Sequence, residues 1–178
     1  MKIFAVMISF VFLILLSACE KPADIKSPNQ YAKHGISFNY PSNWDLMEED
    51  LIEDVTNVSV ESPGSAIFML QIFDEEHAIS LGEFAQWYSK EANELIPIGK
   101  VTSDPLVTVS KKIHSVETSG KKELFTITLL GQKVPHQREF YILEQSGKVL
   151  YLISQMALED QKVVDPGFDL IFKSFSVN

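Results

Sequence analysis

The chain begins with an apolar run that has polar residues on both sides. Lys2 precedes the apolar segment 3–16, and Glu20 and Lys21 follow it closely. The segment is shorter than the roughly 20 apolar residues that a membrane-spanning helix needs. A basic start, an apolar centre and small residues before a cleavage site are typical of a secretory signal peptide. We therefore predict that residues 1–18 are a signal peptide and are removed on export.

Alternating apolar and polar positions predict the first strands of a single domain over residues 35–178. The segment Ile36–Tyr40 alternates strictly, and Pro41-Ser42-Asn43 turns the chain before Trp44 begins another strand. The same period predicts a strand over Thr56–Ser62. A domain of this length is large enough to bury one hydrophobic core.

Two segments depart from this alternation. The segment Ile67–Phe73 is apolar except at Gln71, which is typical of a strand that is buried on both faces. The segment Glu48–Asp54 contains five carboxylates, and we interpret it as a solvated loop. The first of these segments indicates a sheet that is covered on both sides.

Helical spacing predicts the first element that covers the sheet. Ser80 and Glu83 fit a capping box, in which each side chain accepts a hydrogen bond from a backbone N–H at the start of a helix. Apolar residues then recur at helical spacing as far as Leu95, and Pro97 ends the pattern. We expect this helix to pack its apolar stripe on the sheet.

A second helix is predicted near the end of the domain. Asp165 is its predicted N-cap, and Pro166 is its predicted first residue. Its apolar stripe consists of Phe168, Ile171, Phe172 and Phe175.

Four further strands are predicted between the two helices. They lie at Leu106–Thr118, Glu123–Leu130, Arg138–Glu144 and Lys148–Met156, with breaks at 119–121, 131–135 and 145–147. Links this short join antiparallel neighbours, because a parallel crossover needs about a dozen residues or more. The predicted fold class is α/β (α+β), an α/β/α sandwich whose mostly antiparallel sheet is covered by helices on both faces.

The segment before the domain has no apolar periodicity. Residues 19–34 contain Pro22 and Pro28 among mostly polar neighbours, and we interpret them as a lipidated N-terminus and a flexible tether. Fully extended, about 15 residues reach roughly 50 Å. We expect such a tether to hold the domain clear of a membrane.

The end of the signal peptide resembles the lipobox of bacterial lipoproteins. The lipobox pattern is Leu, a small residue, Ala or Gly, then Cys, and the chain has Leu16-Ser17-Ala18-Cys19. The resemblance implies a diacylglycerol on the Cys19 sulfur, cleavage just before Cys19, and acylation of its new amine, for example with palmitate. Two or three acyl chains anchor a protein durably. The alternative is an ordinary signal peptide that ends beside an accidental cysteine.

Three segments of the domain together resemble the PsbP-like and Ran-binding Mog-like superfamily. The opening Gly35-Ile36-Ser37-Phe38-Asn39-Tyr40-Pro41-Ser42-Asn43-Trp44 is similar to the start of those domains. The pair Arg138–Ile142 and Gly147–Tyr151 resembles their last hairpin, and Phe172–Val177 resembles their C-terminal helix ending. The resemblance implies an α/β/α sandwich.

Function varies widely within that superfamily. Its members include extrinsic photosystem subunits, a nucleotide-exchange partner of a small GTPase, and envelope lipoproteins of the DcrB-like type. The resemblance implies a fold that binds other proteins without an obligatory catalytic set. The lipobox points to the bacterial lipoprotein branch, and Glu20 after the cysteine favours the outer membrane, facing the periplasm, over the inner membrane.

Charge and cysteine content narrow the classes of partner. The 178 residues include 15 Lys and Arg against 24 Asp and Glu, and loss of Lys2 with the signal peptide changes the formal net charge from −9 to −10. Such an acidic domain is unsuited to nucleic acid, so we expect no nucleic-acid partner. Cys19 is the only cysteine, so the chain forms no internal disulfide and no thiolate metal cluster.

Motifs that carry catalysis are absent from the sequence. We find no Gly-x-Ser-x-Gly elbow, no Gly-rich phosphate loop and no His-Glu-x-x-His. The run Asp74–His77 offers oxygen and imidazole donors for a divalent metal. Adjacent residues seldom point at one centre, and a solvated loop explains the run equally well. We expect no catalytic, cofactor-binding or metal-binding residues.

Several other residues have a structural and a functional interpretation. His34, His114 and His136 are scattered, and we expect each to be exposed or hydrogen-bonded rather than a catalytic base. The aromatic residues Trp44, Trp87 and Tyr88 could line a ligand pocket, although core packing is the usual role at such positions. Lys111, Lys112, Lys121 and Lys122 would make one hairpin tip locally basic and could mark a partner surface.

These observations lead to one main functional hypothesis and two alternatives. We expect a non-enzymatic envelope lipoprotein, anchored through Cys19, whose domain binds or stabilises another envelope protein. The first alternative is a lipoprotein that binds a small molecule or a divalent metal near Asp74–His77. The second applies if the source is photosynthetic, and is a photosystem-associated assembly factor.

Overall fold

The computed structural model describes residues 21–52, 55–64, 66–96, 99–145 and 147–177. The predicted signal peptide and Cys19 lie outside the described residues. Within the described part of the chain, no helix is both long enough and apolar enough to cross a membrane.

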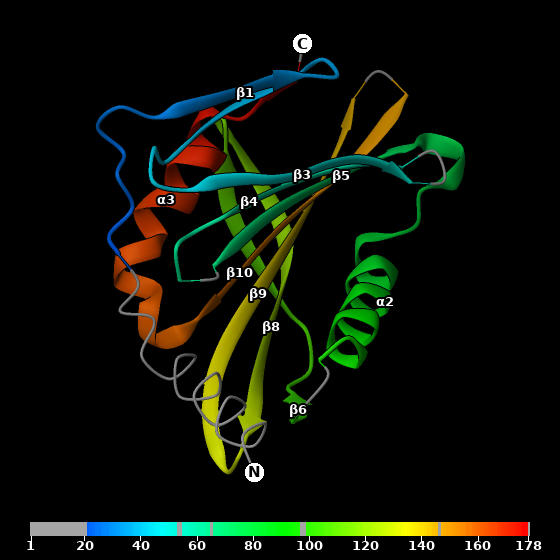
Figure 1. Cartoon of the computed structure of the whole chain (residues 1–178). Coiled ribbons are helices and arrows are strands. Elements are labelled where there is room, and N and C mark those ends of the chain that lie inside the picture. Colours follow the sequence, from blue (N-terminus) through cyan, green and yellow to red (C-terminus); the bar gives the residue numbers. More distant parts are fainter. Residues whose placement is uncertain (1–20, 53–54, 65, 97–98, 146, 178) are drawn as a thin grey trace, which may run out of the picture.

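The main sheet is antiparallel throughout and has eight strands (Figure 1). Its path is β3-β4-β5-β10-β9-β8-β6, and β7 also pairs with β8. The strands are β3 (Asp45–Ile52), β4 (Val55–Glu61), β5 (Ile67–Asp74), β6 (Lys100–Ser103), β7 (Val107–Ile113), β8 (Val116–Leu129), β9 (Gln132–Gln145) and β10 (Lys148–Ala157).

A small second sheet and two helices complete the fold. The small sheet has the order β1-β2-β11, with β1 (Asn29–Lys33), β2 (Ile36–Tyr40) and β11 (Ser176–Val177). Helix α2 (Leu81–Glu94) and helix α3 (Gln161–Ser174) lie on opposite sides of the main sheet (Figure 1). The 3-10 helices η1 (Glu75–His77) and η2 (Leu158–Asp160) precede α2 and α3. The predicted α+β sandwich is confirmed.

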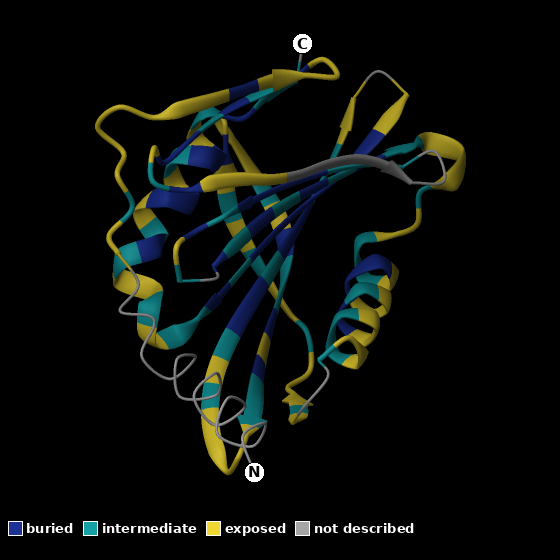
Figure 2. Cartoon of the chain, in the orientation of Figure 1, coloured by how far each residue is buried: buried dark blue, intermediate teal, exposed yellow. Residues whose placement is uncertain are grey.

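The central strand β10 contributes to a hydrophobic core on each face of the sheet. Leu150 and Leu152 belong to the core on the side of α3 and the small sheet, whereas Tyr151 and Ile153 belong to the core under α2. Successive side chains of a strand point to opposite faces, so a strand between two cores is apolar at every position. Figure 2 shows the buried residues concentrated in the strands at the centre of the main sheet.

Helix α2 begins with the predicted capping box. The Ser80 hydroxyl accepts a hydrogen bond from the Glu83 N–H at 3.3 Å, and the Glu83 carboxylate accepts one from the Ser80 N–H at 3.2 Å. Leu95 caps the C-terminal end of α2.

The acidic segment 48–54 is not the predicted loop, because β3 extends through most of it. Asp50 pairs with Asn57 of β4, and Ile52 pairs with Val55. Within the main sheet, β3 is an edge strand. Edge strands tolerate charged residues, which is why the alternation of a half-buried strand is missing from this sequence.

The predicted strand 106–118 is a hairpin that turns at His114 and Ser115. The predicted break at 119–121 lies within β8, where Gly120 pairs with Tyr141 of β9. A Cβ on Gly120 would lie 2.4 Å from the Tyr141 ring, so glycine makes room for a side chain here rather than for a turn. Strand β6 was not predicted.

The predicted tether 19–34 is partly folded. Its residues Asn29–Lys33 form β1, which pairs with β2. Tyr31 is 2% exposed and stacks on Phe38 with the ring centroids 5.0 Å apart. One aromatic side chain in a short edge strand secures this segment, and it produces no periodic pattern in the sequence.

Helix α3 begins earlier than predicted. Its first residue is Gln161, so Asp165 is not the N-cap and Pro166 lies inside the helix. Burial of Val164 in the core on the α3 side accounts for the additional N-terminal turn. This packing outweighs the preference of proline for the first helical position.

Candidate ligand groove beside helix α2

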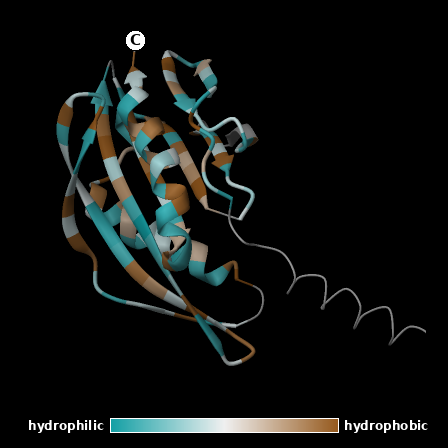
Figure 3. Cartoon of the chain, turned by 90° about the vertical axis from the view of Figure 1, so that its left-hand side faces the viewer, coloured by the Kyte–Doolittle hydropathy of each residue, from teal (hydrophilic) through white to brown (hydrophobic). Residues whose placement is uncertain are grey.

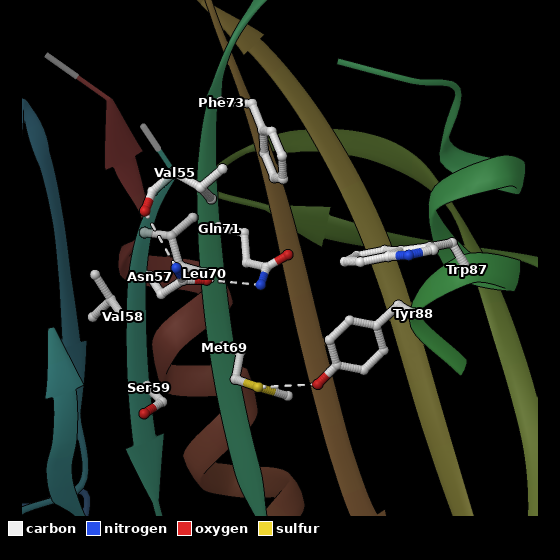
Figure 4. Close-up of a pocket in the computed structure, with 10 residues that line it drawn as sticks. All are labelled: Val55, Asn57, Val58, Ser59, Met69, Leu70, Gln71, Phe73, Trp87 and Tyr88. Atoms are coloured by element: carbon white, nitrogen blue, oxygen red, sulfur yellow. Dashed lines mark hydrogen bonds between the residues drawn. The ribbon is translucent and has the colours of Figure 1, made fainter. Parts of the chain in front are cut away.

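A groove runs between α2 and the part of the sheet that α2 leaves uncovered. Helix α2 packs mainly over β8 and β9, and its outer side meets β4 and β5 only through side chains that line the groove. The groove has a volume of about 500 Å³. Its lining residues are Val55, Asn57, Val58, Ser59, Met69, Leu70, Gln71, Phe73, Trp87 and Tyr88 (Figure 4).

The floor of the groove contains a pair of hydrogen-bonded amides. Gln71 of β5 donates from Nε2 to Oδ1 of Asn57 on β4 at 2.7 Å. Asn57 in turn donates from Nδ2 to the Val55 carbonyl at 3.3 Å. These two bonds fix the orientation of the Gln71 amide.

The Gln71 Oε1 atom is buried and accepts no hydrogen bond from any residue that the structure describes. A buried acceptor without a donor costs about 1–3 kcal/mol, so such atoms are uncommon in folded proteins. In Figure 4 this oxygen points toward the side of the groove where Trp87 lies. The groove therefore has a polar atom that a bound donor would satisfy.

The wall that α2 provides is aromatic. Trp87 is 49% exposed, although it packs at 5.9 Å from Phe84. Tyr88 donates its hydroxyl hydrogen to the Met69 sulfur at 3.1 Å, and burial raises the pKa of Tyr88. Figure 4 shows both rings facing the side chains of β5. Tyr88 thus packs as expected, whereas half of Trp87 is available to a partner.

A buried ion pair supports this wall from behind. Arg138 of β9 donates from Nη1 to Oε2 of Glu123 on β8 at 3.0 Å, and Ser89 of α2 donates to the same oxygen at 2.6 Å. The Arg138 guanidinium lies 5.3 Å from the centre of the Tyr88 ring. Burial lowers the pKa of Arg138, and the neighbouring Glu123 opposes that effect. This cluster was not predicted, because charged residues on a strand usually face solvent.

The other predicted aromatic candidate is part of the core. Trp44 is 1% exposed and packs edge-on against Phe168 of α3 at 5.1 Å. Its ring also lies over Gly167, where a Cβ would approach Trp44 to 2.6 Å.

The acidic run 74–77 does not form a metal site in the structure. Asp74 pairs with Lys148, which lowers the pKa of Asp74 by hydrogen bonding and by its positive charge. Glu75, Glu76 and His77 are exposed in η1. Within the described residues, no group of three or more His, Cys, Asp or Glu side chains converges on a possible metal position.

The three histidines considered as bases lie in separate parts of the fold. His34 and His114 occupy turns with positive φ, at 53° and 57°. His136 of β9 is half-buried and stacks on Phe125 at 5.1 Å, and its Nδ1 lies 2.9 Å from the Val134 carbonyl. None of the three lines the groove.

The lysines of the β7–β8 hairpin do not form a basic tip. Lys111 lies 3.1 Å from Glu139, and Lys122 lies 3.9 Å from the same carboxylate. Lys121 donates to the Thr108 hydroxyl at 3.0 Å. Lys111, Lys121 and Lys122 thus lie along paired strands, and of the four only the exposed Lys112 lies within two residues of the turn at 114–115.

Comparisons with known proteins identify the fold. No protein-family model matches the chain, and no curated protein matches it by sequence. Solved structures do match. The solution structure of cyanobacterial PsbP (CyanoP) from Synechocystis aligns over 92% of this chain and 99% of that chain, at 14% identity and a TM-score of 0.56.

Two further structures are similar over most of the chain. The Ran-binding protein Mog1p from Saccharomyces cerevisiae aligns over 85% of this chain and 95% of its own, at 13% identity and a TM-score of 0.51. A crystal structure from Bacteroides thetaiotaomicron aligns over 84% of this chain and 48% of its own, at 14% identity and a TM-score of 0.50. Identities this low establish the fold alone, and the fold is that of PsbP-like and Mog1-like domains.

Proposed function

We propose that the protein is a non-enzymatic lipoprotein of the bacterial cell envelope that binds a segment of another envelope protein in the groove beside α2. The observation that carries this proposal is the combination of a half-exposed Trp87 with the unpartnered Gln71 Oε1 in one groove. An aromatic wall beside an unused acceptor is suited to a partner that supplies an apolar side chain and a donor.

The composition of the groove supports a protein segment as the occupant. Trp and Tyr are enriched among the residues that dominate protein–protein binding energy, and Met adapts to different partner shapes. Trp87, Tyr88 and Met69 supply these types side by side. A backbone N–H of the bound segment is the natural donor for Gln71 Oε1, because every residue except proline carries one.

The chemistry of the groove supports a binding role rather than catalysis. Among the described residues that line it, Tyr88 alone titrates, and burial raises its pKa above the ordinary value of 10.0. A phenol in that state remains protonated near neutral pH and is a poor general base. The other lining residues are apolar, amide or hydroxyl side chains.

Attachment to the membrane is the second part of the proposal. The lipobox 16–19 supports lipidation of Cys19, and the acidic domain has no need of a basic patch to stay at the membrane. We propose the outer membrane, facing the periplasm, as the site of anchoring. The anchor then keeps the groove close to partners in the same compartment.

Site-specific photocrosslinking in cells tests the proposal. The crosslinking residue p-benzoylphenylalanine replaces Trp87 in one variant, and it replaces Gln86 in the control. Gln86 is exposed on the same helix but does not line the groove. We expect one discrete protein adduct from position 87 and none from position 86.

Two second-site changes make that result specific. Gln71→Leu removes the acceptor, and we expect it to weaken the adduct from position 87 severalfold. Cys19→Ala releases the domain from the membrane, and we expect it to weaken the same adduct. Identical adducts from positions 86 and 87, or no adduct from either, would contradict binding in the groove.

A further inference from the structure

Hydrogen bonds fix the start of the described chain to the domain. The tether that is free to extend toward the lipid is therefore short. Ala23 donates its N–H to the Val163 carbonyl at 3.0 Å, and Asp24 donates its N–H to Asn43 Oδ1 at 2.8 Å. Asn43 Nδ2 donates to the Pro22 carbonyl at 3.1 Å. Three residue steps separate Cys19 from Pro22, and they span at most about 10 Å. The expected reach of roughly 50 Å is therefore too long.

The short linker from Pro22 to Cys19 leaves the domain toward the end of the molecule where the β8–β9 hairpin projects. Between β1 and Lys21 the chain runs alongside α3 toward that end (Figure 1). Ala157, at the end of β10, pairs with His136 of β9. From His136 the hairpin continues for five residues to Gly131, or about 17 Å. The hairpin tip and a lipid on Cys19 can thus reach the same membrane surface.

The tip of this hairpin is apolar and exposed. Leu130 is 84% exposed and Leu129 is 42% exposed. Leu95, which caps the C-terminal end of α2, is 80% exposed. Leu130 and Leu95 are the two most exposed large apolar side chains among the described residues. Figure 3 shows hydrophobic colouring at the projecting tip.

The backbone at the tip also departs from what a solvated turn favours. Leu130 has a φ of 50° and Gly131 has a φ of 83°. Two-residue hairpin turns of this kind favour Asn-Gly or Asp-Gly, because Asn and Asp tolerate positive φ and interact with water. A leucine at such a position is unfavourable both in backbone conformation and in exposure, so its presence calls for an apolar environment.

The charge around the tip is suited to an anionic lipid surface. The segment Leu124–Gln137 contains no acidic residue in a protein that has 24 of them. Lys133 pairs with Thr128 on one side of the tip, and Lys100 of β6 pairs with the same residue on the other. The nearby Glu94 of α2 pairs with Lys90 at 4.0 Å. Lysines beside an apolar tip can extend their ammonium groups to lipid phosphates.

We propose that Leu129 and Leu130 at the tip of the β8–β9 hairpin insert into the lipid surface beside the anchor. This inference rests on the proposed lipidation of Cys19. The hairpin is a second point of attachment, so the domain stands on the membrane with the long axis of its sheet upright. The groove beside α2 then opens sideways, parallel to the membrane, toward neighbouring envelope proteins.

The test uses the full-length lipidated protein in vesicles of phosphatidylethanolamine and phosphatidylglycerol. Lipid blocks the Cys19 sulfur, so Leu130→Cys introduces a single free thiol for the polarity-sensitive dye NBD. The control thiol is Val116→Cys, which is 64% exposed. It lies near His114, whose N–H donates to the Phe172 carbonyl at the C-terminal end of α3. We expect blue-shifted emission and quenching by spin-labelled lipid at position 130 and neither effect at position 116.

Flotation of the vesicles separates the two ways in which the inference could fail. If the protein floats with the vesicles while the dye at position 130 remains in water, the anchor stands and the hairpin insertion is wrong. If the protein does not float, the lipid anchor and the insertion are both wrong. A dye at Leu129→Cys gives a further check, because Leu130→Asn in the same chain should remove its blue shift without harming the turn.

Discussion

Nη1 of Arg138 lies 3.0 Å from Oε2 of Glu123, and both residues are almost fully buried, with 2% and 3% of their surface exposed. Ser89 of α2 donates to the same carboxylate, and Gln155 of β10 accepts from Arg138 Nε at 2.7 Å. The pair therefore joins α2 to three adjacent strands and holds Tyr88 in the wall of the groove.

Removing one partner of this pair should be strongly destabilising. Glu123→Ala leaves the Arg138 charge buried without its counter-charge, and we expect the free energy of unfolding to fall by about 3–5 kcal/mol. The double variant Glu123→Leu with Arg138→Met should recover much of that loss, because both charges are gone. Urea unfolding measures each value. A double variant less stable than Glu123→Ala would contradict this account.

Trp87 and its neighbour Phe84 should differ sharply in their contributions to folding stability and to partner binding. Phe84 is 1% exposed and stacks on Tyr151 at 3.8 Å, so we expect Phe84→Ala to cost about 3–5 kcal/mol of folding free energy. Trp87→Ala should cost about 1 kcal/mol or less, since half of the ring is in solvent. With the crosslinking residue moved to Val55, another residue that lines the groove, Trp87→Ala should nevertheless weaken crosslinking of the partner. Thermal unfolding and crosslinking yields separate the two roles.

Two glycines should respond in opposite directions to alanine. Gly120→Ala places a Cβ 2.4 Å from Tyr141 and 2.7 Å from the Phe140 carbonyl, and we expect a loss of about 1–3 kcal/mol. Gly82 lies in α2 with no atom within 4 Å of its added Cβ. Gly82→Ala should therefore stabilise the protein by about 0.4–1 kcal/mol. Equal effects at both sites, measured by urea unfolding, would refute this contrast.

His136 should make the fold less stable in mild acid. Burial lowers its pKa from the ordinary 6.5, and the nearby Arg138 acts in the same direction. The Val134 carbonyl, Glu159 and Asp160 oppose the shift without cancelling it. The unfolded chain thus binds a proton before the folded chain does. Stability is full above the ordinary pKa and is lost as the pH falls toward the lower value of the folded state.

The matched variant for this prediction is His136→Gln, which cannot titrate. We expect the native protein to lose more stability than the variant between about pH 7.5 and about pH 5.5. Denaturant unfolding at both pH values gives the difference, and the acidic residues common to both proteins cancel in it. Parallel losses in the two proteins would show that His136 is not responsible.

Elements with a local physical cause could be predicted from the sequence. The capping box of Ser80 and Glu83 is complete within four residues, so it located the start of α2. The nearly all-apolar segment Ile67–Phe73 likewise identified β5, but only one face of that strand is fully buried, since the residues facing α2 are half-buried along the groove. In contrast, Gly120 was predicted as a turn, because the ring that requires a glycine there comes from Tyr141 on the neighbouring strand.

The candidate groove could be predicted only in part. Trp87 and Tyr88 were recognised as possible pocket residues, but their exposure depends on how far α2 extends across the sheet, and no local pattern encodes that distance. Gln71 stood out only as the polar residue in an apolar strand. Its unused oxygen follows from the pairing of β4 with β5, which places Asn57 beside it.

The far edge of the long strand β8 is shared between two short strands. Strand β7 pairs with residues 116–122, β6 pairs with residues 125–128, and the Asp104 N–H donates to the Leu124 carbonyl between them at 2.8 Å. An unpaired edge of this length would be a template for strands of other molecules. The proposed lipid anchor would confine many copies to two dimensions, where such templates would meet often. On this side the sheet ends in two short strands, which are poorer templates than one continuous edge of the length of β8.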